Sequence, residues 1–253
     1  AKLTPVDPNC DTCTARPTSG IVRVRSELTV ATVPRDRVKA LSYWNSYQYL
    51  NIWVVQSMPA GPNGEPALNG YAQFPGSVID RYSPSMSTDG VMIRSGVFAL
   101  GETITHEVGH WLGLCHTWAC GAGICGDDNV KDTPQDSEGT FDFNGTFPFN
   151  VDVCTSPTGP AGEMYMNYMD YQSDNVQTMF TNGQNVVMKE TLEGVYDEVA
   201  EISGIGYREY MWSTGNVAAT GVSDGHLTPI CAQKADFAIT TGISSICKDE
   251  DII

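Results

Sequence analysis

Three of the four histidines in this chain lie close together, in the segment His106-Glu107-Val108-Gly109-His110-Trp111-Leu112-Gly113-Leu114-Cys115-His116. On an α-helix, His106 and His110 are about one turn apart and project from the same face. Gly113 has no Cβ, so it can adopt the positive φ that ends a helix and turns the chain back. The spacing therefore predicts that His116 joins the other two histidines in a zinc site, with one coordination position open for catalysis.

Glu107 directly follows the first histidine and would lie beside the metal ion rather than on it. A carboxylate in that place can act as a general base that takes a proton from water during hydrolysis. Two histidines four residues apart also occur by chance on helices that bind no metal. The longer pattern, in a chain with only four histidines, makes a chance cluster or a purely structural one a poor explanation.

A second informative segment, Asn167-Tyr168-Met169-Asp170-Tyr171, lies downstream of the histidines. Taken alone, a methionine among aromatic residues is more often part of a core than of a functional site. Because the histidine pattern precedes it, we expect Met169 to give the metal an apolar floor without binding it. We expect the hydroxyl of Tyr171 to donate a hydrogen bond to a developing oxyanion, as acyl-transfer chemistry requires.

Composition limits the partners and the cellular setting. Acidic residues outnumber basic ones by 30 to 14, and the net charge of −16 argues against binding to nucleic acid. No apolar run of about 18 residues is present, so we expect no membrane insertion. The eight cysteines favour disulfides and a secreted protein, whereas Cys10 and Cys13 lack the second cysteine pair that a zinc knuckle needs.

Apolar alternation or short apolar runs predict strands, and apolar residues at helical spacing predict helices. We expect strands over 21–25, 50–58, 71–74 and 90–100, and helices over 34–48, 103–114 and 181–202. The stretch 117–163 is rich in Gly, Asp and Pro. A segment of this length without regular structure needs disulfides or bound ions to hold it in a compact domain.

The histidine motif followed by the turn at Met169 resembles the metzincin metalloproteases. Three segments resemble, more narrowly, the pappalysin group, which includes ulilysin and the cytophagalysins: 128–134, 167–171 and 180–184. The resemblance covers about 21–222 and implies an α+β fold of two lobes. The upper lobe would hold a twisted mixed sheet and helices, and the lower lobe would be mostly irregular with a C-terminal helix. The strand at 90–95 would line the cleft and pair with the substrate backbone.

The resemblance also implies three functional features at individual positions. Asp128 and Thr133 match residues that bind a structural Ca²⁺, with Asp132 between them, and hard oxygen ligands suit that ion. The alternative for this segment is an acidic, solvated loop. Asp174 matches an acid in the pocket for the residue after the scissile bond, which implies a preference for Arg or Lys there. The alternative for Asp174 is an ordinary surface aspartate.

Cys125 and Cys154 match one disulfide of the pappalysin group. A second disulfide of that group has neither of its cysteines in this chain. Cys115 and Cys120 match no position of the group, and they are close enough in sequence to pair with each other. The pairing of the remaining cysteines stays open at this point.

These features predict three parts of the chain: an N-terminal arm (1–20), a catalytic domain (21–222) and an extension (223–253) that resembles the start of a PKD-type Ig-like module. The expected function is that of a secreted, monomeric zinc endopeptidase acting on proteins or peptides. An inert, zinc-stabilised peptide-binding module is the alternative from another class, although such a module has no need of Glu107. An exopeptidase or amidase is a third reading, but such sites more often add a downstream glutamate than a nearby histidine.

Overall fold

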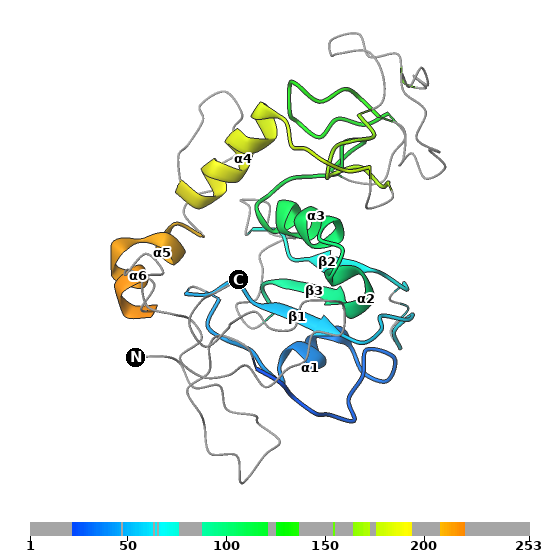
Figure 1. Ribbon diagram of the computed structural model, residues 1–253, viewed down its shortest axis with the longest axis vertical. Coiled ribbons are helices and arrows are strands. Elements are labelled where there is room, and N and C mark those ends of the chain that lie inside the picture. Colours follow the sequence, from blue (N-terminus) through cyan, green and yellow to red (C-terminus); the bar gives the residue numbers. More distant parts are fainter. Residues whose placement is uncertain are drawn as a thin grey trace, which may run out of the picture.

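The computed structural model describes residues 22–46, 48–62, 64, 66–75, 88–120, 125–136, 154, 164–172, 176–193 and 208–220. Three strands and six helices occur within these residues, which confirms the expected α+β class (Figure 1). They are α1 (Arg35–Lys39), β1 (Ile52–Val55), β2 (Gly70–Ala72), β3 (Val91–Arg94), α2 (Ser95–Phe98), α3 (Glu102–Trp111), α4 (Asn182–Glu193), α5 (Glu209–Trp212) and α6 (Thr214–Thr220). The predicted arm at 1–20 and extension at 223–253 lie outside the described residues.

The described strands form one mixed sheet in the order β1-β3-β2. β1 runs parallel to β3, with Trp53 opposite Met92, and β2 runs antiparallel to β3, with Tyr71 opposite Met92. The apolar run of β3 is fully buried, as expected for a central strand. Both edges of β3 are therefore already paired, and the expectation that this strand pairs with substrate is wrong. The edges of the described sheet are β1 and β2, and β2 packs against α3.

A small apolar core forms where α1 and the sheet meet. Its buried side chains come from the segment before α1, from α1, β1 and β3, and from the residue that follows β1 closely: Val30, Val38, Trp53, Met58 and Met92. Side chains of β1 alternate in exposure, since Trp53 is buried while Ile52 and Val54 are exposed. This core anchors the sheet on which the zinc-binding segment rests.

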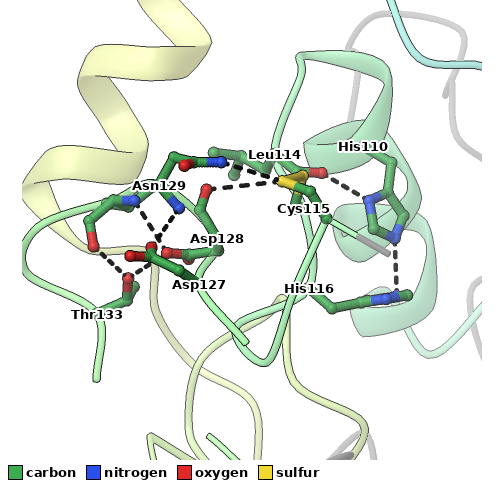
Figure 2. The surroundings of a disulfide bond; sticks show 10 residues. His110, Leu114, Cys115, His116, Asp127, Asp128, Asn129 and Thr133 are labelled. Atoms are coloured by element: carbon green, nitrogen blue, oxygen red, sulfur yellow. Dashed lines mark hydrogen bonds between the residues drawn. A yellow bond between two sulfur atoms is a disulfide. The ribbon is translucent and has the colours of Figure 1, made fainter. Parts of the chain in front are cut away.

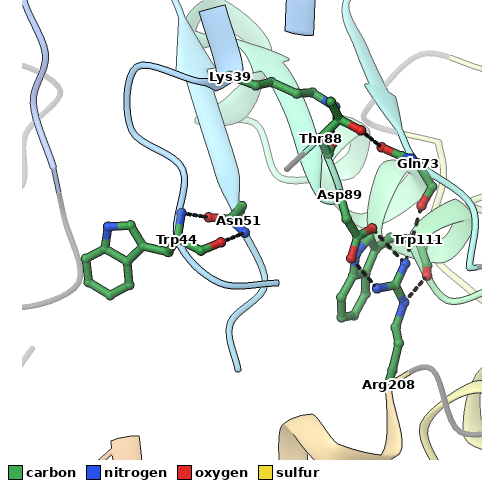
Figure 3. A network of polar contacts seen from close by, with 8 residues as sticks. All are labelled: Lys39, Trp44, Asn51, Gln73, Thr88, Asp89, Trp111 and Arg208. Carbon is green, nitrogen blue, oxygen red and sulfur yellow. Dashed lines mark hydrogen bonds and ion pairs between the residues drawn. The ribbon is translucent and has the colours of Figure 1, made fainter. Parts of the chain in front are cut away.

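Two predictions of secondary structure near the N-terminus are wrong. Residues 22–25 keep the predicted alternation, with Arg23 and Arg25 exposed, but they do not form a strand. Alternation sets which side chains face the protein, whereas a strand also needs a neighbour to complete its hydrogen bonds. The helix expected over 34–48 ends at Lys39. Further along, the Asn51 side chain binds both the N–H and the carbonyl of Trp44, so these two groups are satisfied without a helix (Figure 3).

The segment expected to form one strand over 90–100 divides into β3 and α2. The helix expected over 181–202 begins at Asn182 and is described to Glu193. A reciprocal cap fixes its start: Thr181 Oγ1 accepts from the Gln184 N–H at 3.1 Å, and Gln184 Oε1 accepts from the Thr181 N–H at 2.9 Å. This is the capping box that a Thr-x-x-Gln sequence favours.

A buried ion pair ties the C-terminal described segment to the sheet and to α3 (Figure 3). The guanidinium of Arg208 lies 2.7 and 3.1 Å from the two carboxylate oxygens of Asp89, and both side chains are almost fully buried. Arg208 also donates to the carbonyl of Trp111, the last residue of α3, at 2.8 Å and stacks on its ring. No described helix has the length and apolar character needed to cross a membrane.

Candidate metal centre

The three predicted histidines come together in the structure. His106 and His110 lie one turn apart on α3, and Gly113 has a φ of 94°, which ends the helix and turns the chain as predicted. The Nε2 atom of His116 lies 3.0 Å from His110 Nε2 and 3.3 Å from His106 Nε2. Within the described part of the chain, these histidines are the only group of three or more side chains that could hold one metal ion.

The ring orientation of the two helical histidines suits a cation. The Nδ1 of His106 lies 2.5 Å from the Tyr168 carbonyl, and the Nδ1 of His110 lies 2.7 Å from the Leu114 carbonyl. A carbonyl can only accept, so each Nδ1 carries the proton and each Nε2 keeps a lone pair. Nitrogen lone pairs that face one another cannot form hydrogen bonds with each other. A Zn²⁺ ion placed among them can accept all of these lone pairs as ligands.

Burial keeps all three imidazoles neutral. It lowers the pKa of His106 to about 4 and, together with the neighbouring imidazole, lowers the pKa of His116 to about 3. The pKa of His110 is also well below its usual value, because of burial and then the two other histidines. A neutral ring has its nitrogen lone pair available for a metal at neutral pH.

Glu107 belongs to α3 and its side chain packs against β2, and only 6% of its surface is exposed. A Cβ at Gly70 would lie 2.9 Å from the Cγ of Glu107, so this close approach needs glycine. Burial raises the pKa of Glu107 to about 8, and a hydrogen bond from the backbone of Ala72 opposes that rise. The role of Gly70 was not predicted from the sequence, because no pattern in the residues around Gly70 indicates that it contacts α3.

Met169 is fully buried and lies under α3. A Cβ at Gly109 would come within 2.5 Å of its sulfur, so the helix and this turn touch closely. The side chain of Asn167 holds the turn: its Oδ1 accepts from the Met169 N–H at 2.8 Å, and its Nδ2 donates to Gln184 Oε1 at 2.8 Å. The segments at 167–171 and 180–184 are therefore parts of one contact between the turn and the start of α4.

Two aromatic rings surround His116. The indole of Trp118 stacks on it, with the ring centres 4.3 Å apart and the planes 10° from parallel. The ring of Tyr171 lies 4.6 Å from His116 and 4.8 Å from Trp118, and 39% of Tyr171 is exposed. The structure thus brings Tyr171 to the histidines. Trp118 was not singled out from the sequence, although its position two residues after the last histidine is a usable signal.

The carboxylate of Asp128 is buried in its own loop (Figure 2). Its Oδ1 accepts from the Val130 N–H at 2.9 Å and from the Thr133 hydroxyl at 2.7 Å. Its Oδ2 is buried without a hydrogen-bond partner. Burial raises the pKa of Asp128 to about 6, so this group is costly to ionise in the absence of a cation.

Asp132 has a structural partner of its own. Its Oδ1 accepts from the Thr181 hydroxyl at 2.8 Å, and its Oδ2 accepts from the Gly183 N–H at 2.9 Å. A carboxylate at this position stabilises the N-terminus of α4. Asp174, the fourth acid singled out from the sequence, lies outside the described residues.

Two disulfides occur among the described residues. Cys125 is joined to Cys154, 29 residues further on, with their Cα atoms 5.4 Å apart. Cys115 is joined to Cys120, with their Cα atoms 4.9 Å apart, directly beside the third histidine (Figure 2). The two bridges hold parts of a stretch that has no described helix and only an isolated bridge between His116 and Ala119.

The model of one protein family, Peptidase_M43, described as pregnancy-associated plasma protein-A, matches residues 34–193. The chain belongs to this family. The match covers more than half of the chain and includes the three histidines, Glu107 and Met169. It confirms the resemblance to pappalysin-type metzincins, and it ends before 223–253, the segment predicted to begin a PKD-type module.

Similar curated proteins carry the name extracellular metalloprotease. One from Colletotrichum graminicola is 38% identical over 154 residues, which is 56% of this chain and 49% of that protein. One from Pyricularia oryzae is 36% identical over 151 residues, which is 56% of this chain and 48% of that protein. The matched region thus spans about half the length of these relatives.

Solved structures with a similar fold include mature mirolysin of Tannerella forsythia in complex with a cleaved peptide. Its TM-score is 0.56 at 34% sequence identity, and the match covers 83% of this chain and 73% of that one. A promirolysin variant gives the same TM-score at 33% identity and covers 83% of this chain and 64% of its own. These likenesses support the metzincin-type α+β fold.

Proposed function

We propose that this chain is the catalytic part of a secreted zinc-dependent endopeptidase that hydrolyses internal peptide bonds. One observation carries the proposal: three neutral imidazoles direct their Nε2 atoms toward one another, and a buried carboxylate, Glu107, follows the first of them. The names of the relatives support both secretion and proteolysis. The proposed catalytic domain is 21–222, with the arm before it and the extension after it.

His106, His110 and His116 would hold the zinc ion. When bound, Zn²⁺ supplies Lewis acidity, which lowers the pKa of a water molecule and polarises a peptide carbonyl. Glu107 acts as the general base that takes the proton from the attacking water and returns it to the leaving amine. A cation among the histidines favours the ionised form of this carboxyl, against the burial that raises its pKa.

Two neighbouring groups complete the proposed site. Tyr171 donates its hydroxyl to the developing oxyanion, and the partial exposure of its ring beside His106 and His116 fits that role. The outer edge of β2 offers its backbone to an extended peptide, because β2 is the edge strand of the described sheet that lies against Glu107, whereas β1 is at the opposite edge. A substrate peptide paired with the outer edge of β2 would lie next to Glu107, the proposed general base.

We also propose a calcium site in the 128–133 loop and a preference for Arg or Lys after the scissile bond. The unsatisfied buried Oδ2 of Asp128 supports the first proposal, since a hard cation satisfies such an oxygen. The carboxylate oxygens of Asp132 already bind the start of α4, so Asp128 and carbonyl oxygens of the loop, including that of Thr133, are the principal ligands. The second proposal depends on Asp174 and on charge-assisted pairing.

The test is digestion of a denatured protein mixture, with the cut sites read by mass spectrometry, with and without a zinc chelator. Internal cuts by the zinc-loaded chain are expected, and the chelator abolishes them. Glu107→Gln should lower turnover by about 10²–10⁴-fold, since it removes the general base, while zinc remains bound. Normal turnover in that variant would refute the role of Glu107. A folded, zinc-loaded chain that cuts nothing would favour the inert peptide-binding module.

The same digest tests the finer proposals. Enrichment of Arg or Lys directly after the cut supports the role of Asp174, and Asp174→Asn should reduce that enrichment. Calcium should raise the unfolding temperature of the parent chain more than that of Asp128→Asn. An equal response of the two chains would remove Asp128 from the calcium site.

A further inference from the structure

The three histidines are not oriented by the same kind of contact. His106 and His110 each donate from Nδ1 to a backbone carbonyl, as described above. In the part of the chain that the structure describes, no backbone carbonyl accepts such a bond from His116. A ligand histidine normally needs a partner for its second nitrogen, because that partner fixes the ring orientation. Some other feature must therefore hold the third imidazole.

The first such feature is the indole of Trp118. Its nearly parallel stacking on His116 restricts rotation of the imidazole, and Trp118 itself cannot move freely because only 4% of it is exposed. The ring of Tyr171 closes the same cluster from the side. Stacking thus fixes the plane of a ring that lacks a hydrogen bond to the backbone.

The second feature is the Cys115–Cys120 disulfide. Cys115 precedes His116 directly (Figure 2). The bridge closes a ring of chain, 115–120, that contains both His116 and Trp118. Inside the ring, the Ala119 N–H donates to the His116 carbonyl at 3.1 Å. The ring is tied to the turn under α3, because the Thr117 N–H donates to a carbonyl of that turn at 3.3 Å.

The far end of the ring is also held. The side-chain amide of Asn129 donates to the sulfur of Cys120 at 3.6 Å, and the carbonyl oxygen of Asp128 lies 3.8 Å from the same sulfur (Figure 2). Cys120 therefore packs on the loop that contains Asp128 and Asn129, whereas Cys115 lies in the segment that follows α3. A covalent ring fixed at both ends leaves the His116 backbone few alternative positions.

We propose that the Cys115–Cys120 disulfide and Trp118 are positioning residues that orient His116 for zinc, in place of a backbone hydrogen bond. This inference rests on the zinc site of the proposed function and deepens it. A ligand held in its bound position loses less conformational freedom when the metal arrives, so the ring strengthens zinc binding through preorganisation. Loss of either feature should weaken zinc binding even when the fold is retained.

The test measures the zinc dissociation constant of the full chain by competition with a chromophoric chelator. Cys115→Ala/Cys120→Ala should raise the dissociation constant by about 10–100-fold, the usual range for loss of a group that orients a metal ligand. The matched control is Cys125→Ala/Cys154→Ala, which removes the bridge whose described contacts include no histidine. The control should lower the unfolding temperature and leave zinc affinity near that of the parent.

A second pair of variants keeps the proposal falsifiable if the cysteine variant does not fold. Trp118→Leu should weaken zinc binding, whereas Trp118→Phe, which can still stack, should restore most of the affinity. Circular dichroism checks that each variant is folded. Unchanged zinc affinity in the folded cysteine variant or in folded Trp118→Leu overturns the proposal, as does an equal loss in the control bridge. A parent chain that binds no zinc at all would instead refute the proposed function.

Discussion

The two histidines on α3 and the one that follows it are held by different parts of the molecule. His106 and His110 belong to a regular helix that packs on the sheet and on the buried Met169. His116 belongs to a short covalent ring with a stacked indole. Changes that disturb the helical pair should therefore lower global stability, whereas changes in the ring should lower zinc affinity with a smaller effect on stability.

Arg208→Met should have the largest effect, on the side of the helical pair. The substitution leaves the carboxylate of Asp89 buried without its cation and removes a donor to the last residue of α3. The free energy of unfolding should fall by about 3–5 kcal/mol, as measured by chemical denaturation. The double variant Asp89→Leu/Arg208→Met is the control, and it should recover part of the loss because no unpaired charge remains. A loss below about 1 kcal/mol would contradict a stabilising role for the contacts of Arg208 with Asp89 and α3.

Gly109→Ala should have the next largest effect, because its new methyl group would press on the sulfur of Met169 beneath α3. Overpacking of this kind costs about 1–3 kcal/mol of unfolding free energy. Gly96→Ala is a matched control, since Gly96 also lies in a helix and a Cβ there would meet no atom within 4 Å. The control should be neutral or stabilising by about 1 kcal/mol. Equal stability of the two variants would argue against a tight helix–methionine contact.

The histidine site could be predicted from the sequence because its determinants lie within one short segment. Helical spacing joins His106 to His110, and the missing Cβ of Gly113 permits the turn that returns His116. Each of these rules depends on neighbours in sequence alone. Local rules therefore found the ligands and the general base.

Contacts between distant segments could not be predicted in the same way. Arg208 and its partner Asp89 are 119 residues apart, and no local pattern of either one points to the other. The apolar residues of 90–100 indicated a strand but not its neighbours. The expectation from the family resemblance that 90–95 pairs with the substrate backbone was wrong, because β3 is the central strand. The role of Trp118 depends on the ring closed by the Cys115–Cys120 disulfide. The sequence alone left the pairing of these cysteines open. Sequence periodicity therefore does not predict which distant segments contact each other.

Gly113→Ala tests the turn that connects α3, with His106 and His110, to the ring that contains His116. Gly113 has a positive φ, and a side chain in that region costs about 1–2 kcal/mol of stability. Gly101→Ala, at the other end of α3, is the control: its φ is 100° and a Cβ there would meet no atom within 4 Å. Gly113→Ala should lose somewhat more stability, because a Cβ there would also lie 3.0 Å from the Thr191 hydroxyl oxygen. Only Gly113→Ala should also weaken zinc binding, since it moves His116. Equal zinc affinity in Gly113→Ala and Gly101→Ala would show that the ring positions His116 independently of the turn at Gly113.

The smallest effect, and the most direct comparison, is the hydrogen exchange of the two regions when zinc is removed. The amides of Thr117 and Ala119 donate to carbonyls inside or next to the ring, so their exchange reports its local opening. Chelation should speed their exchange by roughly tenfold, equivalent to about 1.4 kcal/mol, because the third ligand loses its metal. Amides in the middle of α3 should change much less, because the sheet and Met169 hold the helix without the metal. An equal acceleration in both regions would mean that zinc holds helix and ring as one unit, and the contrast between the two kinds of ligand would then fail.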